Sequence, residues 1–213
     1  EDSEKLAVNL GIKHSVIPIG DIYESFADSL EDEFSGLEPD ITEENLQSRC
    51  RGVILMALSN KSGELVLTTG NKSETAVGYS TLYGDTAGGF GVLKDVPKTL
   101  VYELSRYRNT ISHVIPDRII DRPPSAELAP DQQDSDSLPD YAILDKIIEL
   151  YVEQDKSKVE IEESGIDKSM VDRVIRLIDL SEYKRRQAPL GVKITSRGFG
   201  KDRRYPITNK FLK

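Results

Sequence analysis

Residues 65–85, LVLTTGNKSETAVGYSTLYGD, contain the side chains of this sequence best suited to bind a nucleotide. Thr69 and Gly70 would stand at the end of a strand, where parallel sheets present loops and helix N-termini to ligands. The hydroxyl of Thr69 could bond a ribose or a base, and Gly70 would let a ligand approach the backbone closely. Glu74 would project from the first turn of the next helix, where its carboxylate could hold Mg²⁺ or accept a bond from a ribose hydroxyl.

A purely structural interpretation explains the same residues. Asn71 or Ser73 could cap the helix that follows the strand, and Glu74 could complement the helix dipole. The spacing alone does not decide between this interpretation and ligand binding.

Two further groups of residues could contact a ligand. Lys98, at the start of a helix, and Ser125, in a proline-rich loop, are candidate phosphate contacts, although an isolated lysine is usually only solvated. Asn45, Arg49 and Gly52 are spaced by four and three residues, so they would share one face of a helix. The guanidinium fork of Arg49 suits a carboxylate or a phosphate.

The sequence argues against hydrolysis by a protein nucleophile and against a cysteine metal cluster. His14 and His113 are isolated and match neither a Ser-His-Asp arrangement nor a metal-binding spacing. Cys50 is the only cysteine, so it cannot form a disulfide within the chain, and we expect it to be a buried thiol on a helix.

The first half of the chain alternates strand and helix patterns. Residues 14–19 predict a strand, and residues 20–30 predict a helix with Asp21 as its cap. A second helix is expected over residues 45–58, with Thr42 and Asn45 in the positions of a capping box. Residues 64–70 predict a buried strand. This order predicts a layered α/β domain with a parallel sheet.

The second half is predominantly helical. Residues 96–109 predict a helix with Pro97 in its first turn. Residues 116–140 hold five prolines, so we expect a long irregular loop that is mobile without ligand. Residues 141–213 predict a small helical subdomain with a basic tail, appended to an α/β domain over residues 1–140.

The charge is unevenly distributed along the 213 residues. The net charge is −9, but residues 184–213 carry ten Lys or Arg against one Asp, which leaves −18 on residues 1–183. The acidic balance disfavours nucleic-acid binding. The tail could be solvated, hold a phosphate-rich ligand, pack on the chain's own acidic surface or grip a partner subunit. No apolar run reaches the about 20 residues needed to cross a bilayer, and we expect a soluble, cytoplasmic protein.

Long blocks of the sequence resemble the synthetase domain of NAD⁺ synthetases. The blocks include ENLQSRCRG, the run from LVLTTGNKSE to YELSRYRN, IIDRPPSAELAPDQQDSDSLPDY and SEYKRRQAPLGVKITSRGFGKDRRYPI. They cover the chain from about residue 6 to its end, and the forms GNKSE and LYGDTAGGF look more like the glutamine-dependent enzymes than the short ammonia-dependent ones. The resemblance implies a Rossmann-like fold of the adenine nucleotide alpha hydrolase, or N-type ATP pyrophosphatase, class.

The resemblance also implies a ligase. Such enzymes join ATP to the carboxylate of deamido-NAD⁺, release pyrophosphate, and let ammonia displace AMP to give NAD⁺. ATP and Mg²⁺ are the implied cofactors. The implied partners are deamido-NAD⁺, a glutaminase domain that supplies ammonia, and further copies of the chain. Another amidotransferase of the same ATP pyrophosphatase type, or a non-catalytic nucleotide-binding module, is the alternative.

Matching motifs assign roles to individual residues. Glu74 and Lys184 match the catalytic positions, and Glu74 also matches the metal ligand. The positions that match ATP contacts are Thr69, Lys98 and Ser125. The positions that match deamido-NAD⁺ contacts are Asn45, Arg49, Glu74, Tyr79, Leu82, Tyr183 and Lys184.

The sequence departs from the family pattern in three places. Leu82 stands where the short enzymes usually have Lys, and an Asp expected near Gly89 is missing. The pyrophosphate-binding loop with a Ser-Gly-Gly-x-Asp-Ser signature is also missing. We therefore expect a C-terminal portion of a longer enzyme, with little activity alone and an exposed sheet edge that favours self-association.

Overall fold

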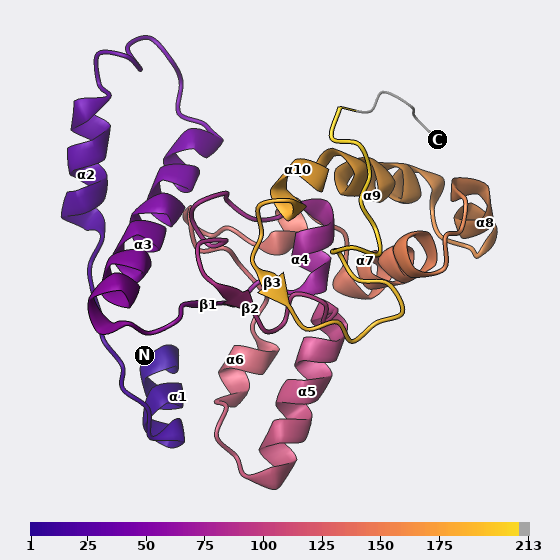
Figure 1. Ribbon diagram of the computed structural model, residues 1–213, viewed down its shortest axis with the longest axis horizontal. Helices are drawn as coiled ribbons and strands as arrows, with labels where there is room; N and C mark the ends of the chain where they lie inside the picture. Colours follow the sequence, from indigo (N-terminus) through magenta and orange to yellow (C-terminus); the bar gives the residue numbers. More distant parts are fainter. Residues whose placement is uncertain (209–213) are drawn as a thin grey trace.

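The computed structural model describes residues 1–208 and is built around a small parallel sheet (Figure 1). Its strands are β1 (Leu67–Thr68), β2 (Phe90–Gly91) and β3 (Leu190–Gly191), in the order β1-β2-β3. Leu67 lies opposite Phe90, and Phe90 lies opposite Leu190, with both pairs parallel. The predicted parallel α/β architecture is therefore confirmed, and the last strand comes from the basic tail.

The N-terminal part of the chain is helical and contains no strand. Its helices are α1 (Asp2–Leu10), α2 (Gly20–Ser29) and α3 (Ile41–Ser62), and α2 and α3 pack against each other (Figure 1). The strand predicted over residues 14–19 is wrong, because this segment has no sheet neighbour and Val16 is 80% exposed. A β-branched run forms a strand only where a sheet offers it a partner and a surface.

The caps of these helices differ from the prediction. Ile19, and not Asp21, is the N-cap of α2, and it makes no side-chain bond. Helix α3 starts earlier than expected, because Asp40 accepts from the Thr42 N–H at 2.7 Å and donates its own N–H to Glu43 at 2.8 Å. The reciprocal capping pair is therefore Asp40 with Glu43 rather than Thr42 with Asn45.

The strand predicted over residues 64–70 is shorter and more exposed than expected. Only Leu67 and Thr68 pair with β2, and the side chains of Leu65 and Leu67 are 66% and 54% exposed. The prediction of a buried strand is wrong because β1 lies at the sheet edge, where Leu65 and Leu67 stay exposed.

The middle of the chain carries three helices and a long loop. The helices are α4 (Lys72–Val77), α5 (Lys98–Ile111) and the short α6 (Asp117–Asp121). Pro97 is the N-cap of α5, which confirms that helix, with its start two residues later than expected. Residues 116–140 are mainly irregular as predicted, apart from α6 and the 3₁₀ turn η1 (Asp134–Asp136).

Helices dominate the region after residue 140. They are α7 (Tyr141–Ile148), which continues as the π-helical turn η2 (Glu149–Glu153), α8 (Lys158–Glu163), α9 (Lys168–Leu180) and α10 (Glu182–Arg185). The hydrophobic core lies mainly among these helices and includes Leu144, Val152 and Ile178.

The same core extends to residues before 140. Ala76 and Val77 of α4 belong to it, and α4 packs on both α7 and α9 (Figure 1). Because the core crosses the boundary expected at residue 140, α4 is held in place by the helical region. In its first turn the Ser73 hydroxyl also donates to Asp145 of α7. Within the described residues, no helix combines the length and apolarity needed to cross a membrane.

Candidate functional site

A narrow cavity lies where the end of β1, the start of α4 and the region after α10 meet. It is lined by residues from several segments, among them Thr68, Glu74, Tyr79, Asp85, Lys94 and Lys184. Its volume is about 40 Å³, which is room for a few water molecules. A nucleotide could therefore enter only if one wall moved.

Glu74 is held by the cap of α4. The Glu74 N–H donates to Asn71 Oδ1 at 3.0 Å, and the Asn71 N–H donates to Glu74 Oε2 at 3.2 Å. This reciprocal pair satisfies two backbone donors that the first helical turn leaves open. The capping interpretation is thus confirmed, and the same cap also points the Glu74 carboxylate at the cavity.

Lys98 lies beside Glu74, although the two residues start different helices. Lys98 Nζ is 3.2 Å from Glu74 Oε1, and the ammonium group lies 5.3 Å from the centre of the Tyr141 ring. The Lys98 N–H also donates to Ser73 Oγ at 2.8 Å, which fixes the start of α5 against α4. A cation thus stands next to the carboxylate that faces the cavity.

Two lysines of the cavity wall are hydrogen-bonded only to backbone carbonyls within the described residues. Lys184 Nζ donates to Gly78 O at 2.7 Å and to Ser80 O at 2.6 Å, and Lys94 Nζ donates to the carbonyls of Ala188 and Pro189. Burial lowers the pKa of both lysines below the ordinary value, and nearby Asp85 partly opposes this for Lys184. Neither ammonium group forms an ion pair within residues 1–208, so an anion in the cavity would be attracted to both.

Tyr79 closes another side of the cavity. Burial, reinforced by the carboxylate of Asp134, raises the pKa of the Tyr79 hydroxyl. Tyr141 has a raised pKa for the same reasons, and its hydroxyl donates to Asp134 Oδ2 at 2.6 Å. Both phenols therefore stay neutral at pH 7 and can act as hydrogen-bond donors.

The three residues predicted to share a face of α3 do so. Asn45 Oδ1 accepts from the Thr81 hydroxyl at 2.8 Å, and Arg49 Nε donates to Leu82 O at 3.3 Å. A Cβ on Gly52 would lie 2.6 Å from the carbonyl oxygen of Tyr83, so only glycine allows this approach. This face supports the turn over residues 81–85, which carries Asp85 into the cavity wall.

Seven of the ten predicted residues do not line this cavity: Asn45, Arg49 and Lys98, which contact its neighbours, and four others. Thr69 is exposed, while its neighbours Thr68 and Gly70 face the cavity, as expected where successive residues point to opposite sides. The Ser125 hydroxyl accepts from the Glu127 N–H at 3.0 Å and is bound within its own loop. Tyr183 is 42% exposed, and Leu82 lines a separate hollow along α3.

Sequence reasoning missed Lys94 and the carboxylate of Asp85 as parts of the wall. Asp85 ends a polar turn and accepts from the Thr81 N–H at 2.6 Å. This contact joins residues four positions apart, so the sequence spacing could have suggested it. No local signal marks Lys94, because the carbonyls that hold it belong to residues more than 90 positions later.

The described part of the basic tail packs on the chain's own acidic surface. Arg186 pairs with Glu182 at 2.8 Å, and Arg203 Nη2 lies 3.5 Å from Asp179. Arg197 also pairs with Asp155. Of the four uses considered for the tail, the structure supports this one, while the basic residues after position 208 lie outside the described residues.

Comparisons with known proteins identify close relatives of the chain. The family model described as NAD synthase matches residues 1–188. The glutamine-dependent NAD(+) synthetase of Acinetobacter baylyi is 56% identical over 211 residues, which is 98% of this chain and 39% of the relative. This chain therefore spans about two fifths of the length of that relative.

Solved structures agree with this result. The glutamine-dependent NAD⁺ synthetase of Acinetobacter baumannii, in complex with ADP, is 50% identical with a TM-score of 0.57, covering 98% of this chain and 37% of its own. The NMN synthetase of Francisella tularensis is 27% identical with a TM-score of 0.71, covering 86% of this chain and 68% of its own.

Proposed function

The chain belongs to the NAD synthase family, and on that premise we propose that it is the synthetase part of a glutamine-dependent NAD⁺ synthetase. Its fold is the Rossmann-like, adenine nucleotide alpha hydrolase fold of these synthetases. The observation that carries the proposal is the cavity in which Glu74, Lys94 and Lys184 meet, within a chain more than half identical to such enzymes.

The proposed reaction has two steps. The carboxylate oxygen of deamido-NAD⁺ attacks the α-phosphorus of ATP, so an acyl-adenylate forms and pyrophosphate leaves. Ammonia then attacks the acyl carbon, the bond to AMP breaks, and the amide of NAD⁺ forms with loss of a proton. A carboxylate alone is a poor acyl donor because its leaving group would be oxide, and adenylation replaces it with AMP. The protein orients two nucleotides and excludes water.

The charges around the cavity suit this chemistry. Lys94 and Lys184 are held only by carbonyl dipoles, so they can offset negative charge on phosphate groups. Glu74 and Lys98 form an adjacent pair that can accept a ribose hydroxyl and contact phosphate, respectively. We assign Glu74 and Lys184 as catalytic residues and Lys98 as an ATP contact. Thr69 and Ser125 remain proposed ATP contacts that would have to reach the nucleotide from outside this cavity.

The dinucleotide would lie between α3 and the cavity. Asn45 and Arg49 contact the turn over residues 81–85, which contains Leu82, and Tyr79 and Lys184 line the cavity. Tyr183 would have to turn inward from its exposed position to touch the ligand. These contacts are proposed for deamido-NAD⁺.

Magnesium fits this site only with a contribution from the nucleotide. Within residues 1–208, no three acidic, histidine or cysteine side chains gather closely enough to hold a metal ion. Mg²⁺ is commonly bound by one or two carboxylates together with phosphate oxygens and water. Glu74 can supply that carboxylate if its ion pair with Lys98 breaks and the freed oxygen binds the metal. When bound, the ion would neutralise phosphate charge.

We further propose the setting of this synthetase part. It comprises an α/β portion over residues 1–140 and a helical portion over residues 141–213, and it works in the cytoplasm with a glutaminase domain as its source of ammonia. We also propose that it forms homo-oligomers. The family relationship supports the glutaminase partner, because the relatives are named for glutamine dependence.

Calorimetry with the chain tests the proposed site, because binding needs no ammonia donor. We expect ATP with Mg²⁺ and deamido-NAD⁺ to bind, and Lys184→Met to weaken deamido-NAD⁺ binding by about tenfold, equivalent to about 1.4 kcal/mol. Glu74→Gln should remove the benefit of Mg²⁺ for ATP binding, since the neutral amide is a poorer ligand for a hard cation.

Glu160→Gln is the matched control. Glu160 caps α8 from the same helix position that Glu74 occupies in α4, and glutamine preserves such a cap in both places. The control should bind like the wild type. Unchanged binding by both site variants would exclude the assignment. Pyrophosphate release by the full-length protein, compared between deamido-NAD⁺ and other carboxylates, separates this function from a different amidotransferase.

A further inference from the structure

One fully buried lysine lies outside the set of proposed ligand contacts. Lys72, the first residue of α4, has a side chain with 0% exposure, although an ammonium group is rarely buried without partners. It does not line the cavity, but its neighbours Gly70 and Glu74 do.

The partners of Lys72 come from three other segments. Lys72 Nζ lies 3.0 Å from Asp95 Oδ1, between β2 and α5, and 2.8 Å from Glu153 Oε1, at the end of η2. It also donates to Thr195 Oγ1 at 2.5 Å and to Arg197 O at 3.1 Å, both in the tail. A single ammonium group therefore connects the start of α4 with the β2–α5 loop, the helical region and the tail.

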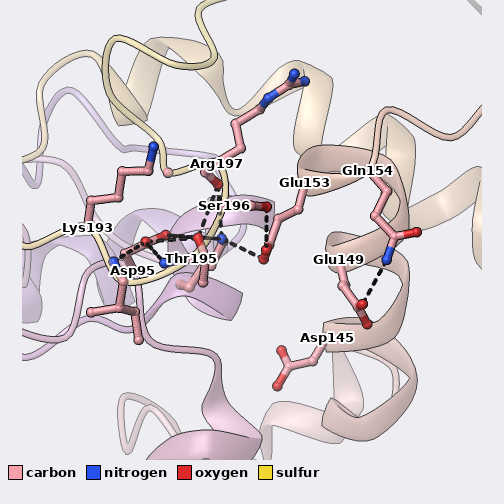
Figure 2. A network of polar contacts seen from close by, with 12 residues as sticks. Asp95, Asp145, Glu149, Glu153, Gln154, Lys193, Thr195, Ser196 and Arg197 are labelled. Atoms are coloured by element: carbon pink, nitrogen blue, oxygen red, sulfur yellow. Dashed lines mark hydrogen bonds and ion pairs between the residues drawn. The ribbon is translucent and has the colours of Figure 1, made fainter.

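The tail is bound to the same carboxylates. Asp95 Oδ2 accepts from the N–H groups of Ile194 and Thr195, each at 2.8 Å, and Glu153 Oε2 accepts from the Ser196 hydroxyl at 3.1 Å. Figure 2 shows Asp95 and Thr195 facing each other, with Ser196 reaching toward Glu153. Burial alone would raise the pKa of Asp95, but these N–H groups and Lys72 together hold it below its ordinary value.

The tail reaches this junction directly from the cavity wall. Ala188 and Pro189 line the cavity, β3 follows at Leu190, and residues 194–197 are bound to Lys72 and to its partners Asp95 and Glu153. The backbone of Lys72 adds a further tie, since its N–H donates to Val96 O at 2.9 Å. The wall carrying Glu74 and the wall carrying Pro189 are thus fastened to each other through Lys72.

We propose that Lys72 is a positioning residue that sets the distance between these two walls and thereby the affinity of the cavity for its nucleotide. This inference rests on the proposed nucleotide-binding function. Lys72 acts without touching the ligand. Its ammonium group holds residues 194–197 against α4 and so, together with the bonds from Lys94, keeps Ala188 and Pro189 at the cavity wall.

Hydrogen exchange and ADP binding, measured on the same variants of the chain, test the proposal. Lys72→Met keeps the length of the side chain and removes the charge. We expect the amides of Ile194 and Thr195 to exchange at least tenfold faster, the amides of α9 to keep their protection, and ADP to bind at least tenfold more weakly. Lys72→Arg restores the charge, and we expect partial recovery of both quantities.

A charge-balanced double variant separates loss of the Lys72 contacts from unfolding caused by an unpaired buried charge. Lys72→Met combined with Glu153→Gln removes one positive and one negative charge, so the net charge of the buried cluster does not change. Thr195→Val is a milder variant that removes only the hydroxyl bonds to Lys72, Asp95 and the Arg197 carbonyl. Both should show the same paired loss of tail protection and ADP affinity, smaller for Thr195→Val.

Each outcome separates the hypotheses. Faster tail exchange with unchanged ADP affinity would show that Lys72 is only structural, and unchanged tail exchange would show that it does not hold the tail; either result overturns the proposal. If the wild-type chain binds no ADP, the proposed nucleotide site fails. Hydrogen exchange alone then tests whether Lys72 holds the tail. Faster exchange of the tail amides in Lys72→Met would support this contact, and unchanged exchange would refute it.

Discussion

At the scale of single residues, Glu74 shows how one side chain can serve a helix and a site together. The structure contains three reciprocal caps with a glutamate in the third helical position, at Glu43, Glu74 and Glu160. Only Glu74 of these three lines the cavity and lies beside a lysine from another helix. The cap motif therefore explains the geometry of Glu74, and its neighbours explain its proposed chemistry.

Lys184 leads to a prediction about pH. Its pKa lies below the ordinary value because of burial, and only the protonated form attracts an anion. We expect the affinity for deamido-NAD⁺ to fall as the pH rises through this lowered pKa, at a lower pH than an exposed lysine would require. Calorimetry at a series of pH values between 7 and 10 measures this affinity. Lys184→Met should show a flatter profile, and an identical profile in the variant would contradict the assignment.

At the scale of elements, two glycines that end helices provide a matched comparison. Gly63 ends α3 with a φ of 76°, and a Cβ added to it would have no atom within 4 Å. Gly78 ends α4 with a φ of 70°, and a Cβ there would overlap Ser181 Oγ. Gly63→Ala should cost about 1–2 kcal/mol, from the left-handed backbone alone.

Gly78→Ala should cost more than Gly63→Ala, since the same backbone strain is joined by a clash with Ser181, beside α10. Urea unfolding of the two variants gives the difference. Equal losses of stability would mean that α4 and α10 do not pack as closely as the structure shows. Because Lys184 follows in α10, Gly78→Ala should also weaken deamido-NAD⁺ binding, and Gly63→Ala should not.

Helix α8 gives a prediction about an exposed cap. The backbone N–H of Ser157, then its hydroxyl and then Lys156, lower the pKa of Glu160 to about 2. A carboxyl group with a lowered pKa stabilises the fold above its unfolded pKa of about 4.3, and this contribution is lost as the pH falls toward 2. Titration by NMR should place the Glu160 midpoint near 2, and Ser157→Ala should raise it. A midpoint near 4 in the wild type would refute the cap.

At the scale of the whole molecule, the structure leaves an apolar sheet edge exposed. Leu65 and Leu67 lie on or beside β1, more than half exposed. Open edges of this kind pair readily with other chains. We predict self-association that Leu67→Lys reduces and Leu104→Lys, on the exposed surface of α5, does not. Sedimentation velocity over a concentration series measures it, and a monomer at all concentrations would contradict the prediction.

The mobility expected for residues 116–140 stays a prediction, but the structure narrows its location. Ile120 and Leu138 are buried, and Asp134 is bound by Tyr141, so both ends of the segment are attached to the body. Between them, Leu128 O accepts from Gln47 of α3 and Gln132 donates to Glu44 of α3, each at 3.1 Å, which leaves the part around Ser125. Fast hydrogen exchange of the backbone amides confined to that part would support its mobility. Slower exchange there when ATP is added would support the proposed role of Ser125.

The sequence alone determined the features that depend on neighbouring residues. Helical periodicity predicted α3, α5 and the helices after residue 140, and the residues before Glu74 predicted a cap on α4 from either Asn71 or Ser73. The family resemblance came from long consecutive blocks. These signals are local because a helix and its cap are stabilised by residues within one or two turns.

Only the tertiary structure decided which distant side chains meet. It showed that residues 14–19 form no strand, that Thr68 rather than Thr69 faces the cavity, and that Lys94 and Pro189 complete the wall. It also buried Lys72 among partners from three other segments. Such contacts join residues far apart in the chain and depend on how helices and strands pack. Packing is set by the whole core, and a local pattern carries little information about it.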